Sequence, residues 1–119
     1  MAKRILYLLR QTPYGSSHAA EALESALVSG VFDQTVCVLF KDDGVWQLVP
    51  DQDGALIGTR TVGKMLKALP EYEITRLFAC ERSLAERNLS PADLVVAVKV
   101  LAPAEQAELL ADQDAVLND

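Results

Sequence analysis

The sequence has few of the residue types that metal and redox chemistry require. Its 119 residues include two cysteines and one histidine, and aromatic residues make up 6 % of the chain. Structural zinc sites usually take four cysteine or histidine ligands, so two separated cysteines and one histidine exclude the common zinc patterns. Cys37 and Cys80 could pair in principle, but the chain has no recognisable secretory signal, and we therefore expect free thiols.

Basic residues and long apolar segments are also scarce. Eleven lysines and arginines stand against seventeen acidic residues, which gives a net charge of −6. Nonspecific binding to nucleic acid needs clustered cations that replace counterions on phosphates, so we expect this chain to repel RNA. The first apolar run is too short for a signal peptide or a membrane span, and we therefore expect a cytoplasmic protein.

What the sequence does contain is enough apolar material for one core. Half of the residues are hydrophobic, there is no repeat or linker, and the length predicts a single domain over residues 1–119. The continuous apolar runs Arg4–Leu9 and Thr35–Phe40 are typical of strands buried on both faces. Between them, apolar residues at helical spacing predict a helix that begins after Ser16 or Ser17 and ends at Gly30.

The second half of the chain continues the alternation of helices and strands. Val45–Val49 is ambiguous between a short helix and an extended segment, and Ser90–Asp93 allows a short helical turn. The last helix should turn three residues inward, namely Ala107, Leu110 and Ala111. The expected elements are a helix over Thr61–Leu69 that Pro70 ends, strands over Ile74–Ala79 and Leu94–Val100, a helix from Pro103 and a strand over Ala115–Leu117. This order predicts an α/β fold with a mostly parallel five-stranded sheet between two helical layers.

Cys80 lies at the predicted junction between a strand and a helix. Ser83 and Glu86 have the spacing of a capping box, which predicts that a helix opens at Ser83 and that Cys80 occupies the turn before it. Free N–H groups at a helix start favour a thiolate or a persulfide anion. Cys80 is therefore a candidate sulfur carrier or nucleophile. The alternative is an unreactive buried thiol, because free cysteine commonly packs as a small hydrophobe.

Other candidate residues should lie near Cys80, because ligands bind at the carboxyl ends of parallel strands. The loop Thr12–Ser17, which contains Pro13, could cradle the phosphate of a flavin or nucleotide, but it has no glycine-rich fingerprint and could equally be a turn and a helix cap. Asp42 and Asp43 could bind a metal or a ribose, or form a simple turn with Gly44. Trp46 could anchor the core or a partner, and we favour a subunit interface.

Four spaced motifs together resemble one known family. They are Pro13-x-Gly15-Ser16, Phe40-x-x-Asp43-Gly44-Val45-x-Gln47-Leu48, Lys67-x-Leu69-x-x-Tyr72-x-Ile74 and Cys80-x-x-Ser83-Leu84-x-x-Arg87-x-Leu89. In this order they resemble the DsrE/DsrF-like sulfur-relay proteins, and within them the TusC (DsrF) subunits, over nearly the whole chain. The rim or interface candidates are then Pro13, Tyr14, Gly15, Asp43, Gly44, Trp46 and Ser83.

The resemblance implies a DsrEFH-like fold and a place in a heterohexamer of TusB-, TusC- and TusD-like chains. Such an assembly passes persulfide sulfur from a TusA-like donor to a TusE-like acceptor for 2-thiolation of the tRNA wobble uridine, and the related DsrEFH assembly serves sulfur oxidation. We expect no metal and no cofactor. The resemblance places the essential carrier cysteine on the TusD/DsrE-like subunit, which implies a mainly architectural role for this chain. Direct persulfide transfer through Cys80 is the alternative.

Overall fold

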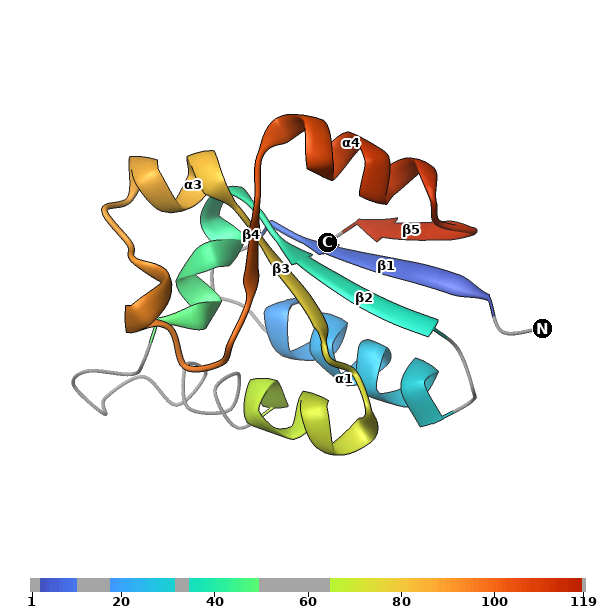
Figure 1. Cartoon of the computed structure of the whole chain (residues 1–119). Helices are drawn as coiled ribbons and strands as arrows, with labels where there is room; N and C mark the ends of the chain where they lie inside the picture. The colour runs from blue at the N-terminus through green and yellow to red at the C-terminus, as the bar shows by residue number, and fades with distance from the viewer. Residues whose placement is uncertain (1–2, 11–17, 32–34, 50–64, 119) are drawn as a thin grey trace.

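A parallel β-sheet forms the centre of the molecule (Figure 1). The computed structural model describes residues 3–10, 18–31, 35–49 and 65–118. Within these residues the sheet has five strands in the order β4-β3-β2-β1-β5, and every neighbouring pair is parallel. The strands are β1 Arg4–Leu9, β2 Thr35–Phe40, β3 Arg76–Cys80, β4 Lys99–Leu101 and β5 Ala115–Asn118.

Helices cover both faces of the sheet, as the alternating sequence pattern predicted. The α-helices are α1 His18–Val31, α3 Glu81–Glu86 and α4 Pro103–Ala111, and the 3-10 helices are η1 Asp42–Leu48, η2 Leu69–Tyr72 and η3 Pro91–Asp93. Residues 65–68 are α-helical and continue into η2. Figure 1 shows α4 on one face and α1, with the helical segment that ends in η2, on the other. The α/β class and the layered arrangement are confirmed.

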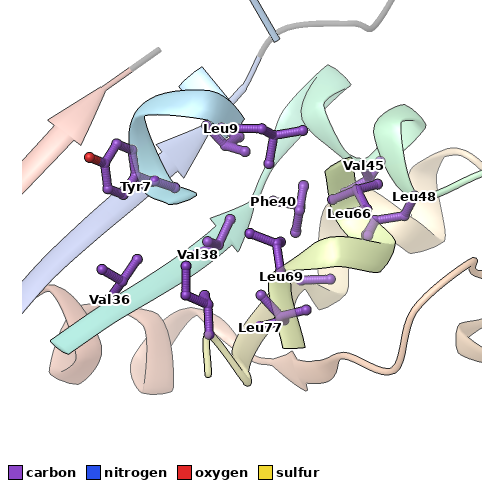
Figure 2. Close-up of a cluster of buried hydrophobic side chains, with 14 of the residues drawn as sticks. Tyr7, Leu9, Val36, Val38, Phe40, Val45, Leu48, Leu66, Leu69 and Leu77 are labelled. Atoms are coloured by element: carbon purple, nitrogen blue, oxygen red, sulfur yellow. The ribbon is translucent and has the colours of Figure 1, made fainter. Parts of the chain in front are cut away.

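Two hydrophobic clusters follow from the alternation of side chains along β1 and β2. Successive residues of a strand point to opposite faces. One face of β1 and β2 therefore packs against α1, η1 and η2 (Figure 2), through Tyr7, Leu9, Val38 and Phe40. The opposite face packs against α4 and β4, through Leu6, Leu8, Cys37 and Leu39. Both strands are buried on both faces, which explains why their sequences are continuous apolar runs.

The first helix is fixed on the sheet by polar as well as apolar contacts. Leu23 and Ala26 of α1 are fully buried. The hydroxyl of Tyr7 lies 2.7 Å from Ser29 Oγ and 3.1 Å from Ser25 Oγ, so the polar end of this core tyrosine is hydrogen-bonded. Such partners remove the cost of burying the hydroxyl group. The helix runs one residue past the predicted end at Gly30.

The fourth strand is shorter than predicted. Apolar and β-branched residues predicted a strand over Leu94–Val100, but only Lys99–Leu101 pairs with β3. The preceding segment is partly buried against the core cluster instead, and the Val95 N–H donates to Leu48 O at 2.9 Å. Residues 94–98 thus have the apolar, β-branched composition that is typical of a strand, although they form a partly buried connecting segment.

The predicted start of α3 is wrong. The helix begins at Glu81 with Cys80 as its N-cap, so Ser83 lies inside the first turn and does not cap it. Glu86 does not complete a capping box, because its carboxylate accepts a hydrogen bond from Arg82 Nε at 2.9 Å. The N-cap is therefore Cys80 itself, three residues before the predicted cap at Ser83.

The last helix begins at Pro103 as predicted, but it turns a different face to the sheet. Gln106 and Leu109 are buried, whereas Ala107 and Ala111 are exposed and Leu110 is half-buried. A buried glutamine is tolerated because Gln106 Nε2 donates to Leu101 O at 2.9 Å. The predicted inward set of Ala107, Leu110 and Ala111 is therefore wrong for both alanines.

The short segments agree with one of the alternatives that the sequence left open. Val45 to Leu48 belongs to η1, and Val49 follows in extended conformation. Ser90 is the N-cap of η3, and its Oγ accepts a hydrogen bond from the Ala92 N–H at 3.4 Å. The predicted loop at 11–17, the loop at 50–58 and the start of the helix at 61–69 lie outside the described residues. No helix in the described part of the chain is long and apolar enough to cross a membrane.

Candidate functional site

Cys80 is at the carboxyl edge of the sheet, the edge at which the parallel strands end. It is the last residue of β3 and the N-cap of α3, with φ −71° and ψ 121°. Its register partner on β4 is Leu101. The residue is 4 % exposed. The predicted position of Cys80 between a strand and a helix is confirmed.

A pocket of about 580 Å³ lies beside this cysteine. It is formed where β2 ends, where α3 begins and along α4, so three separate parts of the chain meet there. The lining residues are Lys41, Asp42, Cys80, Arg82, Ser83, Glu86, Pro103, Gln106, Ala107 and Leu110. The turn after β2 and Cys80 therefore share one rim, as predicted for the ends of neighbouring parallel strands.

Neighbouring residues lower the pKa of the Cys80 thiol. Burial raises the pKa of this thiol, but hydrogen bonds from the Ser83 hydroxyl, the Ser83 N–H, the Gln106 side chain and the Arg82 N–H lower it by more. The net pKa of Cys80 lies below its ordinary value, because donors stabilise the thiolate and not the thiol. The thiolate form of Cys80 is therefore more stable, relative to the thiol, than in an ordinary cysteine.

Cys37 has the opposite environment. It lies within β2, is fully buried, and packs in the cluster under α4. Burial raises its pKa more than the positive charge of Arg76 lowers it. Both cysteines are free thiols, and the predicted core position of Cys37 is confirmed.

The charged groups at the pocket are mostly paired with each other. Arg10 Nε donates to Asp42 Oδ2 at 2.9 Å, and Arg82 pairs with Glu86. Lys41 makes no ion pair with any residue that the structure describes. Exposed ion pairs of this kind contribute only about 0–1 kcal/mol each. The pocket thus has one ammonium group that no described carboxylate neutralises.

The two neighbouring aspartates have separate structural roles. Asp42 has a left-handed backbone, with φ 51°, and its N–H donates to Ser83 Oγ at 2.8 Å. Asp43 accepts a hydrogen bond from Arg87 Nη2 at 3.0 Å. In the part of the chain that the structure describes, no three histidine, cysteine, aspartate or glutamate side chains are grouped as metal ligands. Asp42 thus pairs with Arg10, which follows β1, whereas Asp43 pairs with Arg87 at the end of α3.

Comparison with known proteins now decides the family. Residues 3–118 match the model of the DsrE/DsrF-like family. The chain belongs to this family. It is 38 % identical to the intracellular sulfur oxidation protein DsrF of Allochromatium vinosum over 99 % of this chain and 97 % of that protein. It is 38 % identical to a TusC homolog of Pseudomonas aeruginosa, over 99 % of both chains, and 32 % identical to a TusC homolog of Vibrio parahaemolyticus, over 97 % of this chain and 98 % of that one.

A solved structure supports the fold of this DsrE/DsrF-like chain. The crystal structure of the ychN protein from E. coli superposes with a TM-score of 0.84 and covers all of both chains at 21 % identity. An identity this low is evidence for the fold alone. The predicted DsrE/DsrF-like fold and the sulfur-relay family, within which the named relatives are TusC and DsrF proteins, are both confirmed.

The other predicted rim residues of this DsrE/DsrF-like chain differ in how close they come to Cys80. Ser83 lines the pocket. Gly44 belongs to η1 and is buried against the end of β1, where an added Cβ would lie 1.9 Å from Leu9 O, and this close approach explains the glycine. Trp46 is half-buried on η1, and neither it nor Asp43 is a lining residue. Pro13, Tyr14 and Gly15 lie outside the described residues, as does the proposed phosphate loop.

Gln106 is the site residue that the sequence did not reveal. A glutamine that directly follows a glutamate in an amphipathic helix is normally assigned to the solvent face. The available signal was positional, because Pro103 sets the start of α4 and Gln106 follows it by three residues, on the same face as Leu109. That face is the one that meets the end of β4.

Proposed function

We propose that this chain is a TusC/DsrF-like subunit of a cytoplasmic heterohexamer that passes persulfide sulfur toward 2-thiouridine at the tRNA wobble position. It assembles with TusB- and TusD-like chains, and through them serves a TusA-like donor and a TusE-like acceptor. Its main role is to order the subunit that carries the essential cysteine. The full-length similarity to proteins named TusC homolog and DsrF carries this proposal.

The acidic composition supports an architectural role without direct RNA contact. A net charge of −6 disfavours binding to the phosphates of tRNA, so we assign tRNA binding to another component. The DsrF relative supports a second pathway, sulfur oxidation, in place of tRNA thiolation. The measurement that separates them is the level of 2-thiouridine in tRNA from a strain that lacks this chain. An unchanged level would overturn the tRNA assignment and favour the oxidation pathway.

Assembly is tested by co-expression of this chain with TusB- and TusD-like partners from the same genome. We expect the three chains to purify together in equal amounts by intact mass. A chain that remains alone with its partners present would contradict the proposed role. With assembly established, Cys80→Ser should leave tRNA 2-thiolation nearly intact, whereas deletion of the chain should abolish it.

A second function is favoured by the donors around Cys80, namely that Cys80 itself accepts sulfur. The Cys80 thiolate would attack the outer sulfur of a donor persulfide, R–S–SH. The donor S–S bond breaks, a Cys80–S–SH persulfide forms, and the donor leaves as the thiolate RS⁻. The exchange needs no other oxidant or reductant. The stabilised thiolate at the pocket supports this step.

Mass spectrometry after incubation with a persulfide donor tests the second function. We expect one added sulfur atom on the peptide that contains Cys80 and none on the peptide that contains Cys37, which is buried in β2. The Cys80→Ser variant should gain no sulfur. The second function would be refuted if Cys80 stayed unmodified and the Cys80→Ser variant kept normal tRNA 2-thiolation. The architectural role would then be the function that we assign to this chain.

A further inference from the structure

A groove of about 500 Å³ lies at the start of β3 and β4 and shares no lining residue with the Cys80 pocket. Residues 75–78 and 97–99 line it, so it follows the first part of β3 and the segment that enters β4. Helix α4 leads from β4 to β5 at the opposite edge of the sheet (Figure 1), and Arg76 and Lys99 remain exposed. These two lining residues are therefore accessible to a partner.

Arg76, Phe78 and Lys99 share one face of the sheet. Phe78 is the register partner of Leu39 on β2 and of Lys99 on β4, and register partners point to the same face. Arg76 precedes Phe78 by two residues and therefore has the same orientation. The guanidinium carbon of Arg76 lies 5.8 Å from the centre of the Phe78 ring, which is a cation–π distance. Strand spacings place the Cα atoms of Arg76 and Lys99 about 8 Å apart.

The two cations of this groove have no carboxylate partner among the residues that the structure describes. Neither Arg76 nor Lys99 takes part in a described ion pair. The contact with Phe78 leaves the charge of Arg76 unneutralised. Of the described residues that line the groove, none is acidic. In a chain of net charge −6 this surface is locally positive, and it therefore complements a partner of negative charge.

The remainder of the lining is largely apolar. Phe78 is half-buried and packs against the cluster under α4, and Val98 is half-buried against the cluster on the other face. Two cations are too few to hold the phosphate backbone of a nucleic acid, which is bound by clusters of lysine and arginine. Apolar surface next to two cations suits amino-acid side chains, whose methylene groups cover it while carboxylates reach the cations. The groove therefore fits a protein segment better than RNA.

We propose that this groove binds an acidic, extended segment of a partner protein, with one carboxylate on Arg76 and a second on Lys99. Alternate residues of an extended chain point the same way and are about 7 Å apart, close to the spacing of the two cations. Glutamates at alternate positions thus reach both cations at once, and their methylene groups pack on Phe78. The site goes beyond the proposed function, because no step of sulfur transfer involves it.

The test is fluorescence anisotropy of the full chain with a short fluorescein-labelled peptide in which glutamate and valine alternate. We expect saturable binding that weakens as salt is added, because salt screens exposed charge pairs. A peptide with glutamine in place of glutamate keeps the shape and removes the charge, so it should bind about tenfold more weakly. Absence of binding by the glutamate peptide, or equal binding by the glutamine peptide, would overturn the proposal.

Substitution of the two cations locates the binding. Arg76→Gln and Lys99→Gln should each weaken binding of the glutamate peptide by about two- to fivefold, the range for an exposed ion pair. Lys67→Gln is the matched control and should leave the affinity unchanged. Lys67 is exposed and belongs to the helical segment before η2, which covers the other face of the sheet (Figure 1). Wild-type affinity in the double glutamine variant would overturn the proposal.

Charge reversal provides a gain of binding that a merely damaged fold could not produce. The double variant Arg76→Glu/Lys99→Glu should lose the glutamate peptide and bind a peptide of alternating lysine and valine. A reversed variant with the wild-type urea midpoint that binds neither peptide would overturn the proposal. If the reversal unfolds the chain, the glutamine variants decide alone.

A nucleic acid is the remaining occupant to distinguish from a protein segment. A fluorescein-labelled single strand of DNA takes the place of the peptide in the same anisotropy measurement. We expect it to bind more weakly than the glutamate peptide at equal salt concentration. DNA that binds as tightly, and that loses affinity in the double glutamine variant, would assign the groove to nucleic acid and overturn the proposal.

Discussion

At the scale of single residues, the two cysteines show how position in one sheet controls thiol chemistry. Cys80 ends a strand among hydrogen-bond donors that lower its pKa, whereas burial inside β2 raises the pKa of Cys37. Cys80 therefore remains a thiolate at lower pH than an ordinary thiol does. We expect iodoacetamide to label Cys80 selectively near neutral pH, with a rate that declines as pH falls through the lowered pKa. Equal labelling of both cysteines in the native chain, measured by peptide mass spectrometry, would contradict this prediction.

Lys41 gives a second prediction at this scale. Its ammonium group lines the Cys80 pocket and has no ion-pair partner among the described residues. An unpaired cation attracts anionic reagents and not neutral ones. Lys41→Met should therefore lower the rate of Cys80 modification by iodoacetate relative to iodoacetamide by a few-fold, and more at low salt. Lys67→Met, at an exposed position outside the pocket, is the control and should leave the ratio of the two rates unchanged.

Gly44 gives a third prediction, on stability. A Cβ at this position would lie 1.9 Å from Leu9 O and 2.6 Å from Leu9 C, both backbone atoms that cannot rotate away. Gly44→Ala should therefore lower the free energy of unfolding by about 3 kcal/mol or more, measured by urea denaturation. The neighbouring substitution Asp43→Ala removes only an exposed ion pair and should cost about 1 kcal/mol or less. Similar midpoints for the two variants would show that η1 does not depend on its contact with β1.

At the scale of elements, the strands differ in how much each contributes to stability. β2 is the middle strand of the order β4-β3-β2-β1-β5, and β5 is an edge strand. Leu39 of β2 is fully buried, whereas Leu117 of β5 is 45 % exposed. Leu39→Ala should cost about 2–5 kcal/mol of unfolding free energy, and the same substitution at Leu117 about 1 kcal/mol or less, both by urea denaturation. Equal costs would mean that the edge strand is covered in solution.

The elements that the sequence predicted best are those whose environment is uniform along their length. β1 and β2 have the predicted bounds because burial on both faces excludes polar residues until the strand ends. β4 was overestimated because residues 94–98 pack on the core without joining the sheet, and composition does not distinguish those two kinds of burial. The β-strand propensity of a segment therefore predicts its burial better than its pairing within a sheet.

The candidate site was only partly predictable for a similar reason. Cys80 was located by its position between a strand and a helix, which is a local signal. Ser83 was assigned to the helix cap because its local spacing fitted one, but its partner is the N–H of Asp42, 41 residues earlier. The burial of Gln106 depends on Leu101 O at the end of β4. Contacts between distant segments have no signature in a single sequence.

At the scale of the whole molecule, the charge distribution predicts how the isolated chain behaves with RNA. The net charge is −6, and from Leu101 to the end of the sequence there are five acidic residues and no basic one. Because binding to phosphates depends on cation clusters, we expect no measurable binding of the isolated chain to tRNA by fluorescence anisotropy, even at low salt. Binding that weakens steeply with added salt would contradict this prediction.

Trp46 allows assembly to be followed directly. It is the single tryptophan of the chain and lies half-buried on η1. If it is part of a subunit contact, as we predict, complex formation will transfer the indole to a less polar environment. We expect its fluorescence emission to move to shorter wavelength when partner chains are added. These partner chains must contain no tryptophan, either naturally or after replacement, so that the signal comes from Trp46. An unchanged spectrum in a complex that has formed would place the contact elsewhere.

The parallel arrangement of β1 and β5 has a practical consequence for fusion proteins. Ile5 pairs with Ala115 and Leu8 pairs with Asn118, so the two strands run side by side in the same direction. Arg4 is consequently at the edge of the sheet opposite Cys80, while Asn118 is at the edge that bears it. A fluorescent reporter attached ahead of Arg4 would leave the cysteine-bearing edge accessible, and the same reporter attached after Asn118 would crowd it. The pair of fusions thus distinguishes which side of the sheet a docking protein covers.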